Sequence, residues 1–241
     1  MREALQLSLN VPAVQLLDSV GAPTLVQRMR RAGLNPVFPK VEEPGLSIGL
    51  GGVGLSLADL VQAYAALANG GTKVTLTNGL SAPLPYRHET ILSPQAAWQI
   101  TDILAQIPAP ANAVSRTVAY KTGTSYGYRD AWSIGYDGRY VLGVWVGRAD
   151  NGAVPGSTGG GTAAPILFEA FARSELKAVP FRRAPTGTQV LTQAQLPESL
   201  RKFTPRGRAL VPVMCTVSPP EIVYPPQGAR VDLGMASSQP M

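Results

Sequence analysis

Hydrophobic positions repeat at three- and four-residue intervals through much of the chain, which is the spacing of one face of an α-helix. Asn10 is a suitable N-cap, Ser56 and Asp59 have the spacing of a capping box, and Gly33 suits a helix end. A break at Ser8-Leu9-Asn10 would let side chains project into a cleft. The helices predicted in this way span residues 3–9, 11–20, 24–32, 56–68, 93–107 and 162–176.

Before the last of these helices, the pattern changes to one typical of β-strands. Residues 118–120 predict one strand, and residues 130–136 and 140–147 predict two more. Asp137-Gly138 joins the latter two and is a strong signal for a tight hairpin. Helices that precede a hairpin-containing sheet, with one helix after it, favour an α+β fold over a doubly wound parallel sheet.

After Lys177 the chain becomes rich in proline and in positive charge. Eight of its Lys and Arg residues lie between Arg173 and Arg208, against two Glu, and the net charge of the whole chain is +6. Such a segment could meet a polyanion, but a solvated linker is preferred and no nucleic-acid partner is expected, because aromatic residues are not interleaved. We predict a main domain at 1–178, a linker at 179–218 and the start of a small β module at 219–241. Proteases are expected to cut first between about Val179 and Pro212.

The amino-acid composition limits the kinds of catalytic or metal site that the chain could contain. The 241 residues contain one histidine, His88, and one cysteine, Cys215. A zinc-ligand cluster and an internal disulfide are therefore excluded, and a Ser-His-Asp triad would need His88. An acyl-transfer enzyme would instead use a lysine base. No apolar run is long enough to suggest a membrane span.

Neither a metal nor an organic cofactor is expected. The segment Gly49-Leu-Gly51-Gly-Val-Gly54 fits a dinucleotide-binding pattern and precedes a predicted helix. That function also needs a buried strand just before the glycines and an acidic residue about 20 positions later. Both are missing here, so close packing of a loop against a helix start is the better interpretation.

The segment Tyr120-Lys121-Thr122-Gly123-Thr124-Ser125 has the features of an active-site edge. An ammonium group and hydroxyls lie beside a glycine, which lets a ligand approach the strand backbone. Such a patch suits a substrate carboxylate. Alone, Lys-Thr-Gly is more often a strand ending in a polar turn, and capping would explain Asn10. The two motifs together are much more specific.

With these motifs, the chain resembles penicillin-binding transpeptidases, for which Ser-x-x-Lys, a Ser-x-Asn type of motif and Lys-Thr-Gly are typical. The resemblance covers roughly residues 1–178. The tail from Pro225 to Val231 is similar to the start of the C-terminal module of bifunctional class A enzymes of the 1C type. The matching segments are 2–17, 49–71, 120–125, 130–136, 143–147 and 160–166.

The resemblance implies a peptidoglycan D,D-transpeptidase that forms an acyl-serine with D-Ala-D-Ala stem peptides and also binds β-lactams. Ser8 would relay a proton to the leaving D-Ala nitrogen, and Asn10 would hold the substrate amide and the lysine of Ser-x-x-Lys. Lys121 would support the proton network, so Ser8 and Lys121 are expected at one cleft. The backbone N–H of Thr124 would supply an oxyanion donor. The implied substrate-binding residues are Thr122, Gly123, Thr124 and Ser125.

The nucleophile is expected outside this sequence. In the family Ser-x-x-Lys precedes Ser-x-Asn, whereas only seven residues precede Ser8, and the match Ser174-Glu-Leu-Lys177 is interpreted as a coincidence. We therefore expect a C-terminal fragment of a bacterial inner-membrane protein that works on the periplasmic face. Its glycosyltransferase domain, anchor and nucleophile would precede Met1. The fragment alone is expected to be inactive, with an unpaired sheet edge at the Lys121 strand.

Two alternatives to a peptidoglycan synthase stay open. One is a β-lactamase or D,D-carboxypeptidase of the same fold, and the other is a non-catalytic sensor or scaffold that binds β-lactams. The sequence around Ser8 and the module-like tail favour the synthase. A synthase would bind stem peptides and β-lactams, and it could bind other cell-wall synthesis proteins.

Overall fold

The computed structural model describes residues 2–38, 45–77, 88–111, 113, 116–174, 176–189, 191 and 195. The chain divides into two compact units, Met1–Gln189 and Val190–Met241. Almost all described residues belong to the first unit, which contains the structure discussed below. The β module predicted at 219–241 lies outside the described residues.

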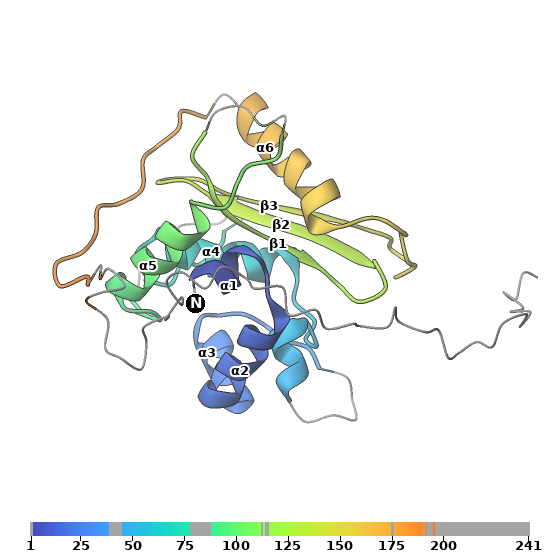
Figure 1. The fold of residues 1–241 in the computed structure, drawn as a ribbon, viewed down its shortest axis with the longest axis horizontal. Helices are drawn as coiled ribbons and strands as arrows, with labels where there is room; N and C mark the ends of the chain where they lie inside the picture. The colour runs from blue at the N-terminus through green and yellow to red at the C-terminus, as the bar shows by residue number, and fades with distance from the viewer. Residues whose placement is uncertain are drawn as a thin grey trace, which may run out of the picture. The chain divides into compact units, whose positions relative to one another are not determined.

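The first unit is built on an antiparallel sheet with helices on both faces, as Figure 1 shows, and its fold class is α+β. The three described strands are β1 (Ala119–Thr124), β2 (Asp130–Tyr136) and β3 (Val141–Gly147), in that order across the sheet. One face is covered by α6 (Ala164–Arg173), and the other by α4 (Leu57–Ala68) and α5 (Pro94–Leu104). The remaining helical segments are α1 (Arg2–Gln6), α2 (Asn10–Val20), α3 (Ala22–Arg31), the 3₁₀-helix η1 (Leu46–Leu50) and the π-helix η2 (Gly159–Ala163).

Alternating side chains along the strands build a core on each face of the sheet. Tyr120 packs with Leu167 and Phe168 under α6, and its ring meets that of Phe168 edge-on at 5.0 Å. On the other face, buried Tyr136 packs with Leu104. Burial of each such side chain contributes about 1.5–3 kcal/mol, so these two layers hold the sheet between its helices.

The predicted capping signals are present except at Asn10, although α1, α5 and α6 each end three residues before the predicted position. Ser56 and Asp59 form the predicted capping box, and Ser93 accepts a hydrogen bond from a backbone N–H at the start of α5. Asn10, however, is the first residue of α2, and the N-cap position is Leu9. The capping explanation for Asn10 is therefore wrong, because Ser8 turns the chain sharply and starts α2 one residue earlier than predicted.

The predicted β2–β3 hairpin is present, but its turn is longer than a two-residue Asp-Gly turn. Tyr136 pairs with Val141, which leaves four residues in the connection. The Asp137 carboxylate accepts hydrogen bonds from the backbone N–H groups of the two residues that precede β3, each at 2.8 Å. Gly138 does not have a left-handed φ. Glycine is needed at position 138 because a Cβ there would lie 2.1 Å from the Pro180 carbonyl oxygen.

Residues 176–186, which we call the strap, pack against the rest of the first unit. The Val179 N–H donates to Asp137, and its carbonyl accepts from the Gly138 N–H at 2.8 Å. The ring of Phe181 meets that of Tyr136 edge-on at 6.1 Å. The compact unit runs to Gln189 and so includes the strap. The boundary near residue 178 and the protease sensitivity of the following linker stay predictions. The prolines suggested a linker, but an extended backbone can still be held by such local contacts.

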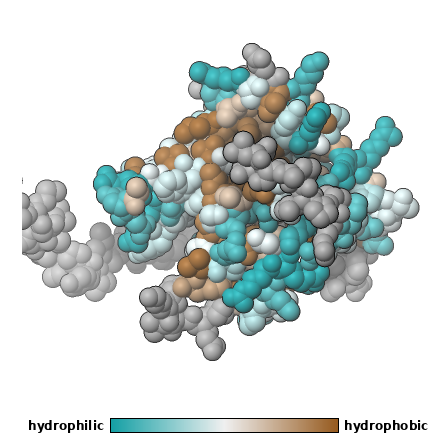
Figure 2. Space-filling model, turned by 180° about the vertical axis from the view of Figure 1, so that it is seen from behind, coloured by the Kyte–Doolittle hydropathy of each residue, from teal (hydrophilic) through white to brown (hydrophobic). Residues whose placement is uncertain are grey.

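The surface of the described chain mixes polar and apolar groups. Figure 2 shows hydrophobic side chains in a broken band across one face, with hydrophilic side chains on either side. Large hydrophobic side chains that are well exposed include Leu7, Leu9 and Val11 around the start of α2, and Tyr126 and Tyr128 in the turn after β1. Exposed apolar groups gathered in this way often mark a surface that meets another molecule or segment.

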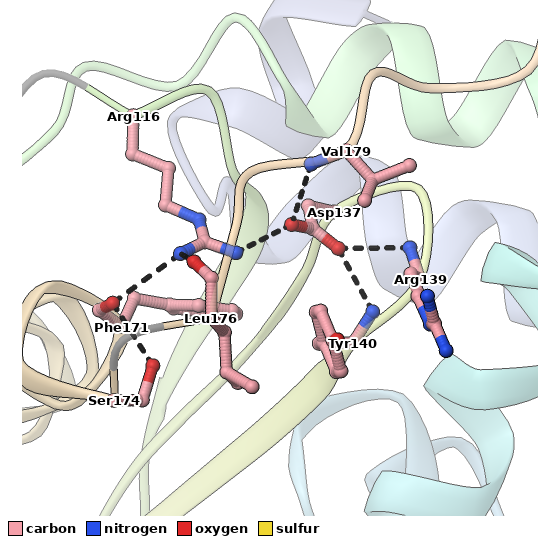
Figure 3. A network of polar contacts seen from close by, with 8 residues as sticks. All are labelled: Arg116, Asp137, Arg139, Tyr140, Phe171, Ser174, Leu176 and Val179. Carbon is pink, nitrogen blue, oxygen red and sulfur yellow. Dashed lines mark hydrogen bonds and ion pairs between the residues drawn. The ribbon is translucent and has the colours of Figure 1, made fainter.

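A buried ion pair joins the strap to the sheet and to α6 (Figure 3). Arg116 Nη2 lies 2.5 Å from Asp137 Oδ2, and the two side chains are 9% and 0% exposed. Arg116 also donates to the carbonyls of Phe171 and Leu176, at 3.3 and 2.8 Å. Burial by itself would raise the pKa of Asp137, but hydrogen bonds from the backbone of Tyr140 and its neighbours and from Arg116 outweigh it and hold the pKa below its ordinary value.

Candidate active site

Ser8 and Lys121, which are 113 positions apart in the sequence, meet in the structure. Lys121 Nζ donates one hydrogen bond to Ser8 Oγ and another, at 2.9 Å, to the carbonyl of Thr122. The predicted approach of the two motifs is therefore confirmed. Burial lowers the pKa of the Lys121 ammonium, so more neutral amine is present near neutral pH than for a free lysine.

Ser8 is held in an uncommon backbone conformation. Its φ of 56° lies in the left-handed region, which costs an L-residue about 1–2 kcal/mol. The conformation is imposed by the break between α1 and α2, where the Leu9 N–H donates back to the Ala4 carbonyl at 2.9 Å. Residues strained in this way cluster at functional sites. The strain here directs the Ser8 hydroxyl towards Lys121.

The Lys-Thr-Gly segment is part of strand β1 and not a polar turn after it. Lys121 pairs with Ile134 and Gly123 with Trp132, so their side-chain positions share the α4 face of the sheet. Beside them is a cleft of about 480 Å³. Five of the seven predicted site residues line it, namely Lys121, Thr122, Gly123, Thr124 and Ser125.

Ser8 reaches this cleft through its contact with Lys121, whereas Asn10 has no such contact. Neither residue lines the cleft itself. In the described part of the chain, no hydrogen bond joins Asn10 to Ser8 or Lys121. The structure thus brings six of the predicted residues together and leaves Asn10 at the exposed start of α2.

The opposite wall of the cleft comes from the glycine-rich segment and α4, which the sequence did not assign to the site. Leu50, Gly51 and Val53 lie on this wall, together with Tyr64 of α4. Gly51 ends η1 with a left-handed φ of 98°, which explains a glycine there. Burial, and then nearby Tyr136, raise the pKa of Tyr64, so its hydroxyl stays protonated. A glycine-rich turn followed by a capping box was the only sequence signal for this wall.

The far end of the Lys-Thr-Gly strand is supported by η2. The Gly159 N–H donates to Thr124 Oγ1 at 3.0 Å. A Cβ on Gly159 would lie 2.4 Å from the Gly123 carbonyl oxygen, so only glycine permits this approach. The Ser125 hydroxyl accepts from the Asp130 N–H at 2.9 Å. Both hydroxyls are therefore oriented before any substrate binds, and Gly159 is a supporting residue that the sequence analysis missed.

Ser174, the serine of the Ser-x-x-Lys match, does not line the cleft beside Lys121. It follows the last residue of α6, and its hydroxyl donates to the Phe171 carbonyl at 3.0 Å beside Arg116 (Figure 3). Across the described ranges, no group of three or more His, Cys, Asp or Glu side chains could hold a metal ion. No helix among the same residues is long and apolar enough to span a membrane.

The Lys-Thr-Gly segment lies on an antiparallel sheet beside an apolar cleft, and its lysine is bonded to the serine of a Ser-x-Asn motif. This arrangement defines the class of penicillin-interacting acyltransferases and hydrolases. Comparison with known families narrows this class. The family model of the penicillin-binding protein transpeptidase domain matches residues 1–166, and the chain belongs to this family.

Among curated relatives, the chain is 43% identical over 171 residues to penicillin-binding protein 1C of Escherichia coli, covering 69% of this chain and 22% of the relative. It is 32% identical to penicillin-binding protein 1A of Aquifex aeolicus, covering 61% of the chain and 22% of that protein. The chain thus spans about a fifth of the length of these relatives.

Solved structures share the fold at lower identity. Penicillin-binding protein 1A from Haemophilus influenzae matches with a TM-score of 0.61 at 19% identity, covering 76% of this chain and 36% of that one. PonA1 from Mycobacterium tuberculosis, in complex with penicillin V, also matches with a TM-score of 0.61. The identity is 21%, and the match covers 80% of this chain and 62% of that one.

Proposed function

We propose that the first unit is the peptidoglycan D,D-transpeptidase part of a bifunctional synthase, which cross-links D-Ala-D-Ala stem peptides and is acylated by β-lactams. The observation that supports this most strongly is the hydrogen bond from Lys121 to Ser8 at the edge of the Lys-Thr-Gly cleft. The 43% identity to penicillin-binding protein 1C favours the 1C type. The parent protein would work at the periplasmic face of the bacterial inner membrane, where other cell-wall synthesis proteins could bind it.

In this proposal, a serine attacks the carbonyl carbon of the penultimate D-Ala, and the bond to the terminal D-Ala nitrogen breaks. The serine proton passes to that nitrogen through Ser8, while the Lys121 ammonium stabilises the charges of the relay. An acceptor amine then attacks the ester carbonyl, the bond to the serine oxygen breaks, and the proton lost by the amine passes to that oxygen to restore the serine hydroxyl. Lys121, Thr122 and Thr124 bind the substrate carboxylate, and the Thr124 N–H donates to the oxyanion.

We further propose that the nucleophilic serine is not among these 241 residues. The hydroxyl of Ser174 is bonded at the end of α6, away from the Lys121 cleft. A second Ser-x-x-Lys match, Ser199-Leu-Arg-Lys202, lies outside the described residues. Both serines therefore need a direct test.

Labelling with a fluorescent penicillin tests the proposal. We expect no covalent labelling of the 241-residue chain, because a missing nucleophile removes the covalent route altogether. Joining the upstream segment of the parent gene should restore labelling. In that longer protein, Lys121→Ala should slow labelling by about a hundredfold or more, the scale expected for losing a group of the acid-base network.

Lys73→Ala is the matched control, because Lys73 pairs with Glu89 and does not line the cleft. It should label at the wild-type rate. Stoichiometric labelling of the 241-residue chain that disappears in Ser174→Ala or Ser199→Ala would contradict the proposed position of the nucleophile. An upstream segment without Ser-x-x-Lys would favour the scaffold alternative. Rapid hydrolysis of the acyl-enzyme would favour a β-lactamase.

A further inference from the structure

A second cavity, of about 230 Å³, lies at the Tyr136 end of strand β2. Its walls are the end of α4, one side of α5 and the strap. It shares no lining residue with the Lys-Thr-Gly cleft. Its volume is below the range of about 300–1,000 Å³ that holds drug-sized ligands, so it suits a smaller molecule. Its lining includes three aromatic residues and two arginines, namely Trp98, Tyr136, Phe181, Arg182 and Arg183.

The interior of this cavity is aromatic. The partly exposed rings of Trp98 and Phe181 line it, and the Phe181 ring packs edge-on against Tyr136, which is itself fully buried. The Tyr136 hydroxyl is already bonded to Thr101 Oγ1 at 2.8 Å, in a buried position. Trp98 and Phe181 therefore offer a ligand mainly ring faces and edges. Such surfaces bind another ring by apolar and edge-to-face contacts.

The rim of the cavity is positively charged. Arg182 and Arg183 are exposed there, and no acidic side chain of the described residues lines the cavity. Within the described residues, neither arginine forms an ion pair. Arg182 is held in place because its Nη2 donates to Asn69 Oδ1 at 3.0 Å. A guanidinium oriented in this way can bind a carboxylate through its remaining N–H groups.

We propose that this cavity binds a small organic anion with one or two rings, of the aromatic carboxylate class. The ring lies against Trp98 and Phe181, and the carboxylate faces Arg182 and Arg183. The proposal is independent of the transpeptidase function, because it uses none of the cleft residues. It also gives a role to two arginines of the basic segment, which the sequence alone assigned to a solvated linker.

Binding is coupled to the position of the strap, which supplies one wall. Phe181 and both arginines belong to the strap, so the complete cavity exists only while the strap is docked. A ligand that binds only the docked form stabilises that form. Gly138→Ala should disturb the docked form, because the added Cβ would lie 2.1 Å from the Pro180 carbonyl oxygen.

Tryptophan NMR can test this proposal on the whole chain, because the three tryptophans report separately on the two cavities. Trp98 lines the new cavity, while Trp132 lines the cleft and Trp145 packs against Trp132. The ¹⁵N-tryptophan-labelled chain is titrated with 2-naphthoate and with the neutral 2-acetonaphthone. We expect a saturable shift of the Trp98 indole signal, with naphthoate binding about tenfold more tightly than the ketone.

Arg182→Gln combined with Arg183→Gln should weaken naphthoate binding about tenfold and leave the ketone unchanged. Arg30→Gln with Arg31→Gln removes the same charge from an exposed turn of α3 and should leave both affinities unchanged. Gly138→Ala should weaken the binding of both probes, as measured by the shift of the Trp98 signal. An unmoved Trp98 signal, equal affinity for the two probes, or wild-type naphthoate binding in the Arg182/Arg183 variant would each overturn the proposal.

Discussion

At the residue scale, the site combines a strained backbone with a half-buried cation. Ser8 keeps a left-handed φ, and its hydroxyl accepts a hydrogen bond from Lys121. The ammonium is partly desolvated, which lowers its pKa, while the serine oxygen replaces part of the lost hydration. The left-handed backbone of Ser8 destabilises the folded chain, whereas its hydrogen bond to Lys121 stabilises it. Substitutions at position 8 can therefore separate the two effects.

Ser8→Gly and Ser8→Ala both remove the hydroxyl but differ in backbone cost. Glycine adopts a left-handed φ readily, whereas alanine keeps most of the strain. We expect Ser8→Gly to be more stable than Ser8→Ala by about 1 kcal/mol in urea unfolding. The same two replacements at Gln15, an exposed position in the middle of helix α2, are the control and should rank in the opposite order, because glycine destabilises a helix interior. Equal stability of the two Ser8 variants would contradict a strained Ser8.

At the scale of elements, Asp137 connects three parts of the first unit. Its carboxylate accepts from the turn before β3, from Arg116 and from the strap, all within one buried network (Figure 3). Removing one member of a buried ion pair leaves the other charged group without compensation in a poorly solvated place. The hairpin turn and the strap should therefore lose stability together.

Asp137→Asn should destabilise the first unit by about 3 kcal/mol in urea unfolding. Asp150→Asn is the control, since Asp150 pairs with Arg148 on the surface, where ion pairs contribute little. It should leave the unfolding midpoint almost unchanged. A similar small effect of both substitutions would show that the Asp137 network does not stabilise the unit.

The pH dependence of this effect has a defined sign. The pKa of Asp137 is lower in the folded chain than its ordinary value, so its stabilisation is complete above about pH 4. It should be lost as the pH falls through the lower folded pKa. Unfolding measured from pH 7 to pH 2 should therefore show the difference between wild type and Asp137→Asn shrinking only below about pH 4. A difference that shrank already between pH 7 and pH 5 would contradict this assignment.

At the scale of the whole molecule, the described sheet has two edge strands, β1 and β3. The sequence analysis placed an unpaired edge only at the Lys121 strand, which is β1. β3, however, reads Val141-Leu-Gly-Val-Trp-Val-Gly147, without a charge or a proline. Uncharged edges of this kind tend to pair with another chain.

We expect the 241-residue chain to self-associate through β3 at high concentration. Trp145→Lys places a charge on this edge and should shift sedimentation velocity profiles towards the monomer. Ile166→Lys adds the same charge at an exposed position of α6 and should not change the association. Equal behaviour of these two variants would show that association, if present, does not use the β3 edge.

Much of the fold was predictable because its signals are local. Capping at Ser56, the helix start near Ser93 and the strands of the hairpin depend on neighbours within a few residues, and the structure confirms them. The Ser-x-Asn and Lys-Thr-Gly motifs likewise identified the family from residue types and order. The role of Asn10 as a catalytic residue stays a prediction, as do those of the other proposed site residues.

Only the tertiary structure decided how distant segments meet. It placed Ser8 on Lys121, and it made the Gly49–Gly54 segment a wall of the cleft. It also packed residues 176–186 against Asp137 and Tyr136, where proline content had suggested a free linker. Local propensity describes the conformation of a segment, whereas these contacts depend on which other surfaces the folded chain brings within reach. The sequence by itself therefore determined the elements and the family, and long-range packing determined the walls of both cavities and the end of the first unit.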